Sequence, residues 1–392
     1  MVSKKLKMLL LPAILLFTFY CNAQKKLQSK TISVDTASFQ NSAHHWYDIF
    51  DKSNVVNSKP NQPRYKSTEI ISIGDNILFY QKDNGGWPKN YDMLAILTPA
   101  QKDSLLKVKN ILNTTFDNST TYSHVACLAN IYSATKLERF KAAALKGIDY
   151  ILSAQYKNGG WPQYYPLEKN YSKEITFNDD NITGIMTLFK DIKENKSEYS
   201  FVDEMMRKKV MLSFEKGLQC ILKTQINDAG KPTAWCQQYD EVTLQPAWAR
   251  AFEPPSICNA ESSGVVLLLM SIEHPSKSII AAVENAVVWF NQSKIYNTKV
   301  KTIPAPDTTY RYRYSRTDKI VVNDSSAPTI WTRYYELKTH RPLFCNRDSK
   351  VVYSLAEVDR ERRDGYGWYT YEPQKVLNKY PSWHKKWAPG NN

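Results

Sequence analysis

The chain has 392 residues, of which 42% are apolar and 23% are charged. This composition is typical of a globular protein with a large core, and it excludes a disordered or collagen-like chain. Lys and Arg number 52 against 38 Asp and Glu, a net charge of +14 that favours an acidic partner. Nucleic acid, anionic lipid and acidic polysaccharide all fit that charge, but 10 Trp and 25 Tyr favour flat ligands such as sugar rings.

Residues 1–23 have the features of a cleaved secretory signal peptide. Lysines near the start precede an apolar run at 8–20, and Cys21 to Ala23 follow it. The run is too short to span a bilayer comfortably, and no later segment supplies about 18 consecutive apolar residues. We therefore expect a secreted or periplasmic protein with no stable membrane insertion. A lipoprotein anchored at Cys21 is the alternative, which the bulky Phe19 and Tyr20 disfavour.

A polar leader and a repeated motif come next. Residues 24–66 are rich in Ser, Lys and Asn, and we interpret them as a leader that wraps the main domain at 67–392. Within that domain the sequence Asn-Gly-Gly-Trp-Pro at 84–88 recurs at 158–162, and a degenerate third copy runs from 224 to 235. Such recurrence indicates repeated supersecondary units.

Each copy of the repeat follows a helical pattern of apolar residues. Glycine then ends the helix, because it tolerates the left-handed backbone that a helix terminus needs. The pattern predicts helices at 100–113, 122–135, 142–153, 181–194, 211–223, 260–273, 278–292 and 356–363. The alternation from Tyr310 to Tyr314 predicts one β-ribbon. We therefore predict an all-α fold, an α/α toroid of repeated helix pairs with few short strands and long loops that hold the active site.

Two acidic stretches precede predicted helices. Asp117 and Asn118 lie in the first, at 116–121, where helix capping is a sufficient explanation. Asp179 and Asp180 lie in the second, at 175–181, among four consecutive oxygen-bearing side chains, which is more than one cap requires. Clustered carboxylates and amides suit a hard cation such as Ca²⁺, so a metal site assembled from separate loops is the functional hypothesis.

Basic and aromatic residues are interleaved farther along the chain. Trp248 and Arg250 lie in a proline-rich segment that could stack on a sugar ring and pair with a carboxylate. The alternative for Arg250 is an ion pair with Glu253. Further stretches at 331–336, 339–348 and 361–369 suit an anionic polymer built of rings.

These motifs together resemble the pectate lyases of the tenth polysaccharide lyase family. The resemblance covers roughly residues 67–385, in the family's order. It rests on the Asn-Gly-Gly-Trp-Pro repeats, Thr-Phe-Asn-Asp at 176–179, Ala-Arg-Ala-Phe-Glu-Pro-Pro at 249–255 with Glu-Ser-Ser-Gly at 261–264, the segment from Arg-Tyr-Tyr-Glu-Leu at 333–337 to Arg-Pro-Leu-Phe at 341–344, and Glu-Arg-Arg-Asp-Gly-Tyr-Gly-Trp-Tyr at 361–369. It implies an α/α toroid that cleaves polygalacturonate by calcium-assisted β-elimination.

The resemblance also implies roles for single residues. Asp179 and Asp117 match calcium-site carboxylates, with Asp180 as a further oxygen donor. Arg250 matches a clamp on a substrate carboxylate. The expected substrate contacts also include Asn118, Trp248 and Lys338.

The catalytic base is expected to be an arginine between 333 and 344. We favour Arg341 over Arg333, because Pro342 fixes the backbone of Arg341 whereas Arg333 is expected inside a helix. Lys338 is the alternative base, with a lower ordinary pKa of about 10.4. An arginine base implies a strongly alkaline optimum, since arginine is normally protonated.

The chemistry agrees with these roles independently of the family. Removal of the C5 proton of a uronate leaves negative charge in its C6 carboxylate, and both Ca²⁺ and arginine neutralise such charge. Two alternatives differ in their products. A glycoside hydrolase using Asp179 and Glu253 would act without calcium and give saturated ends, and a non-catalytic pectin-binding protein would give no product. We expect a monomer that binds polygalacturonate and no nucleic acid.

Overall fold

The computed structural model describes residues 32–48, 54–310 and 313–388, so the proposed signal peptide lies outside the described residues. The α-helices are α2 (Gln40–Asp48), α3 (Ile70–Tyr80), α4 (Pro99–Leu106), α5 (Tyr122–Thr135), α6 (Glu138–Ser153), α7 (Asn181–Lys193), α8 (Glu204–Lys223), α9 (Asn259–Met270), α10 (Lys277–Gln292), α11 (Arg360–Gly365) and α12 (Glu372–Trp387). Short 3-10 helices are η1 (Ala37–Phe39), η2 (Asp117–Ser119), η3 (Tyr171–Lys173), η4 (Asn178–Asp180), η5 (Ser197–Tyr199) and η6 (Leu355–Glu357). Most predicted helices are confirmed to within a few residues, but the one at 100–113 ends at Leu106 and the one at 356–363 divides into η6 and α11.

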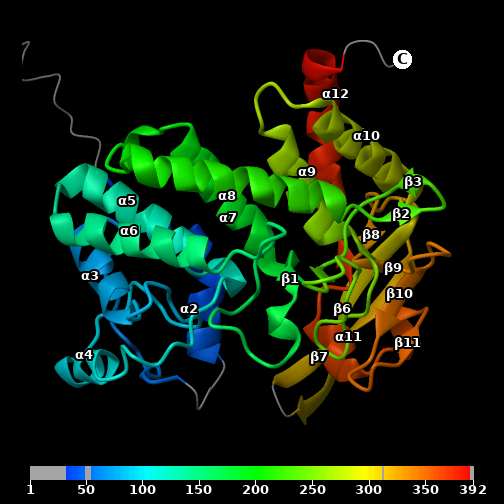
Figure 1. Ribbon diagram of the computed structural model, residues 1–392. Helices are drawn as coiled ribbons and strands as arrows, with labels where there is room; N and C mark the ends of the chain where they lie inside the picture. Colours follow the sequence, from blue (N-terminus) through cyan, green and yellow to red (C-terminus); the bar gives the residue numbers. More distant parts are fainter. Residues whose placement is uncertain (1–31, 49–53, 311–312, 389–392) are drawn as a thin grey trace, which may run out of the picture.

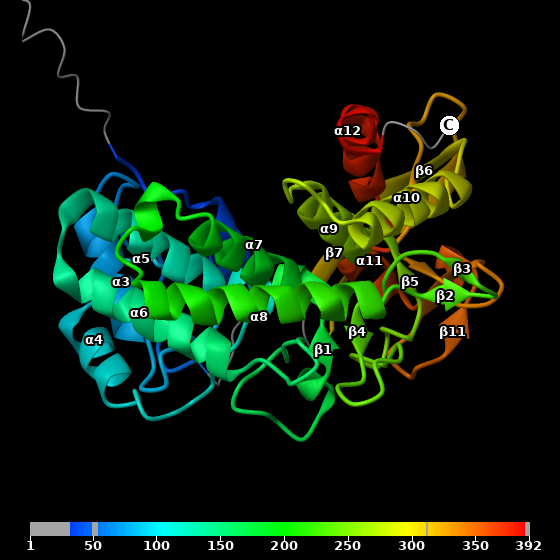
Figure 2. The ribbon, with the colours of Figure 1, turned by 45° about the horizontal axis from the view of Figure 1, so that its top comes forward.

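The main helices pack in two layers. One layer holds α5, α7 and α9, and the other holds α3, α6, α8 and α10, so that α5 pairs with α6, α7 with α8 and α9 with α10. Figures 1 and 2 show α3 and α4 at one end of this row and α10 and α12 at the other. The row of helix pairs is therefore open at its ends.

The sequence repeat has a physical basis at the C-terminal ends of the helices in the layer of α3, α6, α8 and α10. The indole Nε1 of Trp87, Trp161 and Trp235 donates a hydrogen bond to a carbonyl near the end of α3, α6 and α8, at 2.8, 2.9 and 2.8 Å. Trp331 makes the same bond to Phe290 of α10 at 2.8 Å, and it marks a fourth copy that the sequence pattern did not reveal. Each bond is accepted by a carbonyl in the last turn of its helix, where the regular hydrogen bonds of the helix run out.

The glycines of the repeat allow its loop to approach the next helix of the same layer. Gly159 has a φ of +99°, and a Cβ added there would overlap the carbonyl oxygen of Lys216 in α8. Gly230, in the degenerate third copy, has a φ of +84° but open space around it. A comparison of substitutions at the two positions therefore separates the cost of close packing from the cost of backbone strain.

We expect Gly159→Ala to lower the free energy of unfolding by about 3 kcal/mol or more, because it combines strain with a clash against backbone. Gly230→Ala carries the strain alone and should cost about 1–2 kcal/mol. Denaturant unfolding of both variants measures the difference. Equal losses would show that the approach to Lys216 does not matter.

The prediction of an all-α toroid is wrong, because strands form a substantial part of the chain. The strands are β1 (Ile175–Thr176), β2 (Asn227–Asp228), β3 (Lys231–Pro232), β4 (Gln238–Tyr239), β5 (Ile257–Cys258), β6 (Thr298–Thr309), β7 (Tyr314–Asn323), β8 (Trp331–Thr332), β9 (Tyr334–Tyr335), β10 (Pro342–Cys345), β11 (Val351–Val352) and β12 (Tyr369–Thr370). One sheet has the order β11-β10-β9-β5, and the pairs β1-β4, β12-β8, β2-β3 and β6-β7 form two-stranded sheets. All these pairs are antiparallel.

Two sequence expectations for this part need correction. The ribbon was expected at 310–314, but its two long strands lie mostly outside that range, since β6 runs from Thr298 to Thr309 and β7 from Tyr314 to Asn323, while residues 311 and 312 lie outside the described residues. Arg333 was expected inside a helix, yet it lies between β8 and β9. The strand-rich part has its own hydrophobic core, which includes Phe252, Phe344 and Trp368.

The leader packs against the main domain where the structure describes it. Trp46 of α2 is buried and donates from Nε1 to the carbonyl of Val56 at 2.8 Å. The hydroxyl of Ser42 donates to the carbonyl of Tyr91 at 2.8 Å. No helix in the described ranges has both the length and the apolar character needed to cross a membrane.

Candidate active site

The two acidic stretches form the same unusual turn, one ahead of α5 and the other ahead of α7. Thr-Phe-Asp-Asn-Ser leads into α5 and Thr-Phe-Asn-Asp-Asp leads into α7, and each turn holds two consecutive residues with positive φ. These are Asn118 and Ser119 at 51° and 61°, and Asp179 and Asp180 at 49° and 58°. Non-glycine residues adopt this backbone seldom, and such strain clusters at functional sites.

Asp179 lies in the more acidic of the two turns. It accepts a hydrogen bond from the amide of Asn178 at 2.8 Å. Burial and the nearby Asp117 raise its pKa to about 7, although Arg333 and Arg250 act in the opposite direction. Burial and Glu261 of α9 likewise raise the pKa of Asp180. Neither Asp180 nor Asp117 caps a helix through its side chain. In the first stretch the capping contact belongs to Thr121, whose backbone amide donates to Nδ1 of His124 at 3.1 Å.

Asp117 forms an ion pair with Lys89, which follows the first Asn-Gly-Gly-Trp-Pro motif. Burial alone would raise the pKa of Asp117, but Lys89 outweighs it and holds the pKa below its ordinary value. The second carboxylate oxygen, Oδ1, is buried and has no hydrogen-bond partner among the described residues. Asp117 therefore has one carboxylate oxygen that its ion pair with Lys89 does not use.

Arg333 connects the strand-rich part to the helix ends. Its guanidinium donates to the side-chain oxygen of Asn178 at 2.8 Å and forms an ion pair with Glu261. The side chain is only 15% exposed, and the guanidinium lies 4.8 Å from the ring centre of Tyr366. Burial would lower its pKa, but Glu261 raises it well above the ordinary value.

Arg250 is the more accessible arginine of the cluster, with 42% of its side chain exposed. Its Nε donates to buried Glu253 at 2.8 Å, and a second bond makes the pair bidentate, so the Arg250–Glu253 ion pair considered as the alternative is present. Tyr366 donates from its hydroxyl to the same carboxylate at 2.7 Å. Burial would lower the pKa of Arg250, but Glu253 raises it far more.

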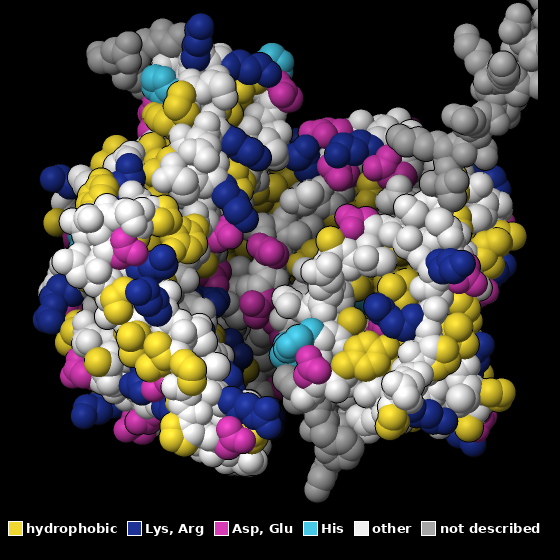
Figure 3. Space-filling view, turned by 180° about the vertical axis from the view of Figure 1, so that it is seen from behind, with side chains coloured by type: hydrophobic (Ala, Val, Ile, Leu, Met, Phe, Trp, Pro, Cys, Tyr) yellow, Lys and Arg dark blue, Asp and Glu magenta, His cyan; other side chains and the backbone are white. Residues whose placement is uncertain are grey.

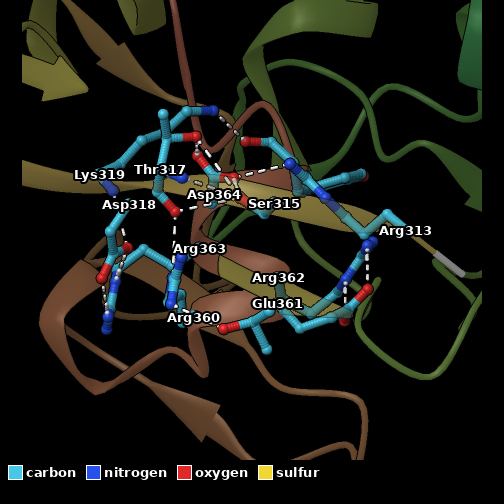
Figure 4. Close-up of polar contacts among 12 residues, drawn as sticks. Arg313, Ser315, Thr317, Asp318, Lys319, Arg360, Glu361, Arg362, Arg363 and Asp364 are labelled. Carbon is cyan, nitrogen blue, oxygen red and sulfur yellow. Dashed lines mark hydrogen bonds and ion pairs between the residues drawn. The ribbon is translucent and has the colours of Figure 1, made fainter. Parts of the chain in front are cut away.

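The loop that carries Tyr366 is fastened to the β6-β7 hairpin. Asp364 accepts hydrogen bonds from Arg313 at 2.7 Å, Ser315 at 2.6 Å and Thr317 at 3.0 Å (Figure 4). Arg363 forms a bidentate pair with Asp318 of β7 in the same network. The hairpin thereby holds α11 and the loop beyond it beside the cluster.

The charges of the cluster do not balance. Five carboxylates face three basic side chains, an excess of two negative charges. The carboxylates are Asp117, Asp179, Asp180, Glu253 and Glu261, and the bases are Lys89, Arg250 and Arg333. Burial is the main cause of the raised pKa of Asp179 and the nearby Asp117 adds to it; a divalent cation with oxygen ligands would remove the excess of negative charge. The residues present therefore fit a calcium ion, with Asp179 and the free oxygen of Asp117 as its first donors.

A closed metal cage is not formed by these acids alone. In the described ranges, the one group of three acidic, histidine or cysteine side chains whose ligand atoms lie within 4.8 Å of one another is Glu174, Asp240 and Glu241. Lys173 pairs with Glu241 at 2.6 Å and with Glu174 at 3.8 Å, so it offsets one of the three negative charges of that group. A cation in the cluster would therefore take further oxygens from a ligand.

Arg341 and Lys338 do not join the cluster. Arg341 is exposed, and its guanidinium lies over the ring of Tyr353 at 3.8 Å. The β9-β10 pairing sets Pro342 opposite Tyr335, so Arg341 lies opposite Glu336, three residues beyond Arg333 and about 10 Å along the strand. Lys338 is exposed in the turn between these strands.

Two other expected substrate contacts lie near the cluster in the chain. Trp248 is 42% exposed and precedes Arg250 by two residues, so its ring is accessible to a ligand. Asn118 lies beside Asp117 in η2.

Sequence reasoning missed several residues of the cluster. Glu261 and Tyr366 lie within the recognised motifs and Lys89 directly follows one, but no local feature distinguished them from their neighbours. The recurrence of Thr-Phe followed by Asp or Asn at 115–117 and 176–178 could have indicated that Asn178 occupies the position of Asp117 in the other turn. His45 of the leader also lies within electrostatic range of the cluster. Burial lowers its pKa, and the charges of Lys89 and Arg250 lower it further.

The site lies between the helix ends and the strand-rich part. Seen from behind, the molecular surface is hollowed between these two parts, with acidic and basic side chains along the hollow (Figure 3).

The chain matches the model of the pectic acid lyase family over residues 81–377. Among solved structures it is similar to a family 10 polysaccharide lyase from Cellvibrio cellulosa, with 28% identity, a TM-score of 0.68, and coverage of 79% of this chain and 91% of that one. It is also similar to an alanine mutant of a family 10 lyase from the same organism in complex with trigalaturonic acid, with 27% identity, a TM-score of 0.67 and coverage of 79% and 92%. A comparison with curated proteins gives no match.

These matches define the class of the protein as a polysaccharide lyase. The chain belongs to the pectic acid lyase family, as the sequence motifs indicated.

Proposed function

We propose that the protein cleaves polygalacturonate, the de-esterified chain of pectin, by calcium-assisted β-elimination. The observation that carries the proposal is the excess of carboxylates at the ends of α5 and α7, set opposite the accessible Arg250. The structural relative bound to trigalaturonic acid supports an acidic galacturonate ligand.

Asp179 and Asp117 would hold the calcium ion, and Asp180 could add an oxygen. When bound, calcium would neutralise the substrate carboxylate and the charge that develops there as the C5 proton leaves. Lys89 would release Asp117 or share it, because the ion pair occupies one of its oxygens. Trp248 and Asn118 would contact the sugar rings beside the cluster.

We assign the role of catalytic base to Arg250 rather than to Arg341. Arg341 is turned toward Tyr353, and Arg333 is buried with its guanidinium bonded to Asn178 and Glu261. Arg250 alone among the three both acts electrostatically on Asp179 and has a substantially exposed side chain, at 42%. Its neutral form would accept the C5 proton, and Glu253 would stabilise the resulting cation. Since Glu253 also raises the pKa of Arg250, we expect turnover to rise with pH well into the alkaline range.

The test is to incubate polygalacturonate with the purified protein, with calcium or with a chelator, and to follow the ultraviolet absorbance of unsaturated ends. We expect the absorbance to rise with calcium and to stop with the chelator. New reducing ends without absorbance would indicate hydrolysis instead. Highly methyl-esterified pectin should be a poor substrate, because its carboxylates are masked.

We also propose that the mature protein is exported as a monomer to the periplasm or the medium, where such a polymer is found. The basis is the signal-like segment 1–23. The N-terminal sequence and the sedimentation mass of the native protein would test this proposal.

A further inference from the structure

The hydroxyl of Tyr366 makes contacts on two sides. It donates to buried Glu253 at 2.7 Å, and its oxygen lies 2.6 Å from the hydroxyl oxygen of Tyr334. Burial raises the pKa of Tyr366 well above its ordinary value, although Arg333 acts in the opposite direction. The hydroxyl therefore remains a hydrogen-bond donor in the alkaline range, where we expect turnover to be highest.

These two contacts connect the proposed base to the turn ahead of α7. Glu253 holds the guanidinium of Arg250 through two hydrogen bonds. On the other side, Tyr334 donates to the side-chain oxygen of Gln237, and the backbone carbonyl of Gln237 accepts from the amides of residues 177 and 178 in that turn, at 2.8 and 3.1 Å. Because Arg250 and Glu253 lie in one loop, their ion pair alone does not fix the loop relative to the turn. The contacts of Tyr366 join the two.

The β6-β7 hairpin holds the Tyr366 loop at two points (Figure 4). At the end of α11, buried Asp364 accepts hydrogen bonds from Ser315 and Thr317 of β7. At Tyr366 itself, the ammonium of Lys319 donates to the backbone carbonyl at 3.3 Å. Ser315, Thr317 and Lys319 alternate along the strand, so they lie on one of its faces. That face of the hairpin therefore sets the position of the loop.

Asp364 is also paired with a charge. The guanidinium of Arg313 donates to it at 2.7 Å, and the carboxylate side chain is only 4% exposed. Such a buried ion pair adds little net stability, because the cost of removing both charges from water offsets most of their attraction. Three donors that converge on one carboxylate do, however, determine where that carboxylate lies.

We propose that Asp364 is a positioning residue for the catalytic base, a role that rests on the proposed function. Asp364 anchors the loop so that the Tyr366 hydroxyl holds Glu253. Through Glu253, the guanidinium of Arg250 stays at a fixed place relative to the turn that carries Asp179. The β6-β7 hairpin thereby supports the reaction, although none of the residues that define the acidic cluster lies on it.

The first test is a double-mutant cycle of Asp364→Asn and Tyr366→Phe. Each single variant should lower kcat on polygalacturonate by about tenfold or more and change KM little, because a base displaced by a fraction of an ångström loses its alignment with the proton. The double variant should lose no more than Tyr366→Phe alone, since Asp364 acts through that hydroxyl. Losses that multiply would overturn the proposal.

Asp318→Asn is the matched control. Asp318 lies on the same strand, and its bidentate pair with Arg363 is another link between the hairpin and α11. That link includes neither Asp364 nor the Tyr366 loop. The control should lower the melting temperature but keep kcat. An equal fall of kcat in the control would overturn the proposal, because general loosening of the hairpin would then explain the effect.

A milder pair of variants applies if Asp364→Asn does not fold. Thr317→Val removes one of the three donors to Asp364 and keeps the shape of the side chain. It should lower kcat in the same direction by a smaller factor, and Thr317→Ser, which keeps the hydroxyl, should retain the wild-type value. Equal activity of the valine and serine variants would contradict the positioning role.

A spectroscopic measurement reports the position of Arg250 without the reaction. In protein with ¹⁵N-labelled arginine, the Nε–H signal of Arg250 reports its 2.8 Å hydrogen bond to Glu253, and Arg250→Lys identifies that signal. Asp364→Asn and Tyr366→Phe should shift the signal and speed its hydrogen exchange. Asp318→Asn should leave it unchanged.

The outcomes separate the two proposals. No turnover of polygalacturonate by the wild type would overturn the proposed function, and the Arg250 signal would still decide whether Asp364 positions that side chain. Turnover by the wild type together with an unchanged Arg250 signal in Asp364→Asn would overturn the positioning role and leave the proposed function in place.

Discussion

Arg250→Ala is expected to reduce kcat on polygalacturonate by about 1000-fold or more, whereas Arg341→Ala should keep most of the activity. Arg250 lies beside Asp179 with an accessible guanidinium held rigidly by Glu253, and Arg341 lies over Tyr353 outside the cluster. Steady-state kinetics of both variants measures the contrast.

The separate effects of the substitution on kcat and on KM distinguish a catalytic base from a side chain that only binds the substrate carboxylate. Loss of a base lowers kcat and leaves KM nearly unchanged, while loss of a clamp raises KM. Removal of Arg250 also leaves buried Glu253 unpaired, so Arg250→Ala combined with Glu253→Gln should recover stability without recovering turnover. Near-normal activity of Arg250→Ala, or an equal loss in Arg341→Ala, would return the role of base to Arg341.

Asp179→Asn is expected to remove most of the activity and most of the thermal stabilisation by calcium, and yet to stabilise the metal-free protein at alkaline pH. Asp179 has a folded-state pKa of about 7, above its ordinary value of 3.8, because of burial and Asp117. The folded state therefore holds the proton more tightly than the unfolded state, and the stability of the metal-free protein falls as pH rises from about 4 to about 7. Above that range the full penalty applies, on the order of 2–4 kcal/mol.

The variant should lack this fall with pH, because asparagine does not titrate. The measurement is the melting temperature of metal-free and calcium-loaded protein at mildly acidic and alkaline pH, together with activity. Asp149→Asn, the same change at an exposed position of α6, is the control and should behave as the wild type. Full calcium stabilisation in Asp179→Asn would remove this residue from the metal site, whatever its effect on activity.

The incorrect prediction of the fold class shows which strands a local sequence pattern does not reveal. Strands of two residues, such as β4 and β9, are too short to show alternation, so the sequence pattern predicted helices and only one ribbon, at 310–314. The long strands β6 and β7 were missed for a different reason. Both are largely exposed along their length, so they lack the apolar period that identifies a strand with one buried face.

The choice of base shows the same limit within the site. Pro342 fixes the backbone next to Arg341, and that local argument is sound, but it does not say which way the strand faces. The pairing of β9 with β10 and β5 decides that, and it directs Arg333 to Glu261 while Arg341 lies near Tyr353.

The sequence by itself determined most of the helices, though not α2, α3 or α12, together with the glycines of the repeat, the excess of cations over the whole chain and the family to which the motifs belong. These properties are local or additive, so they can be read from neighbouring residues. The tertiary structure alone decided which oxygens and guanidiniums meet. Arg333 and Asn178 are 155 residues apart and Arg333 and Glu261 are 72 apart, and such contacts form only when the strand-rich part packs against the helix ends. The raised pKa of Asp179 arises from the same packing, because burial and the converging carboxylates exist only in the folded chain.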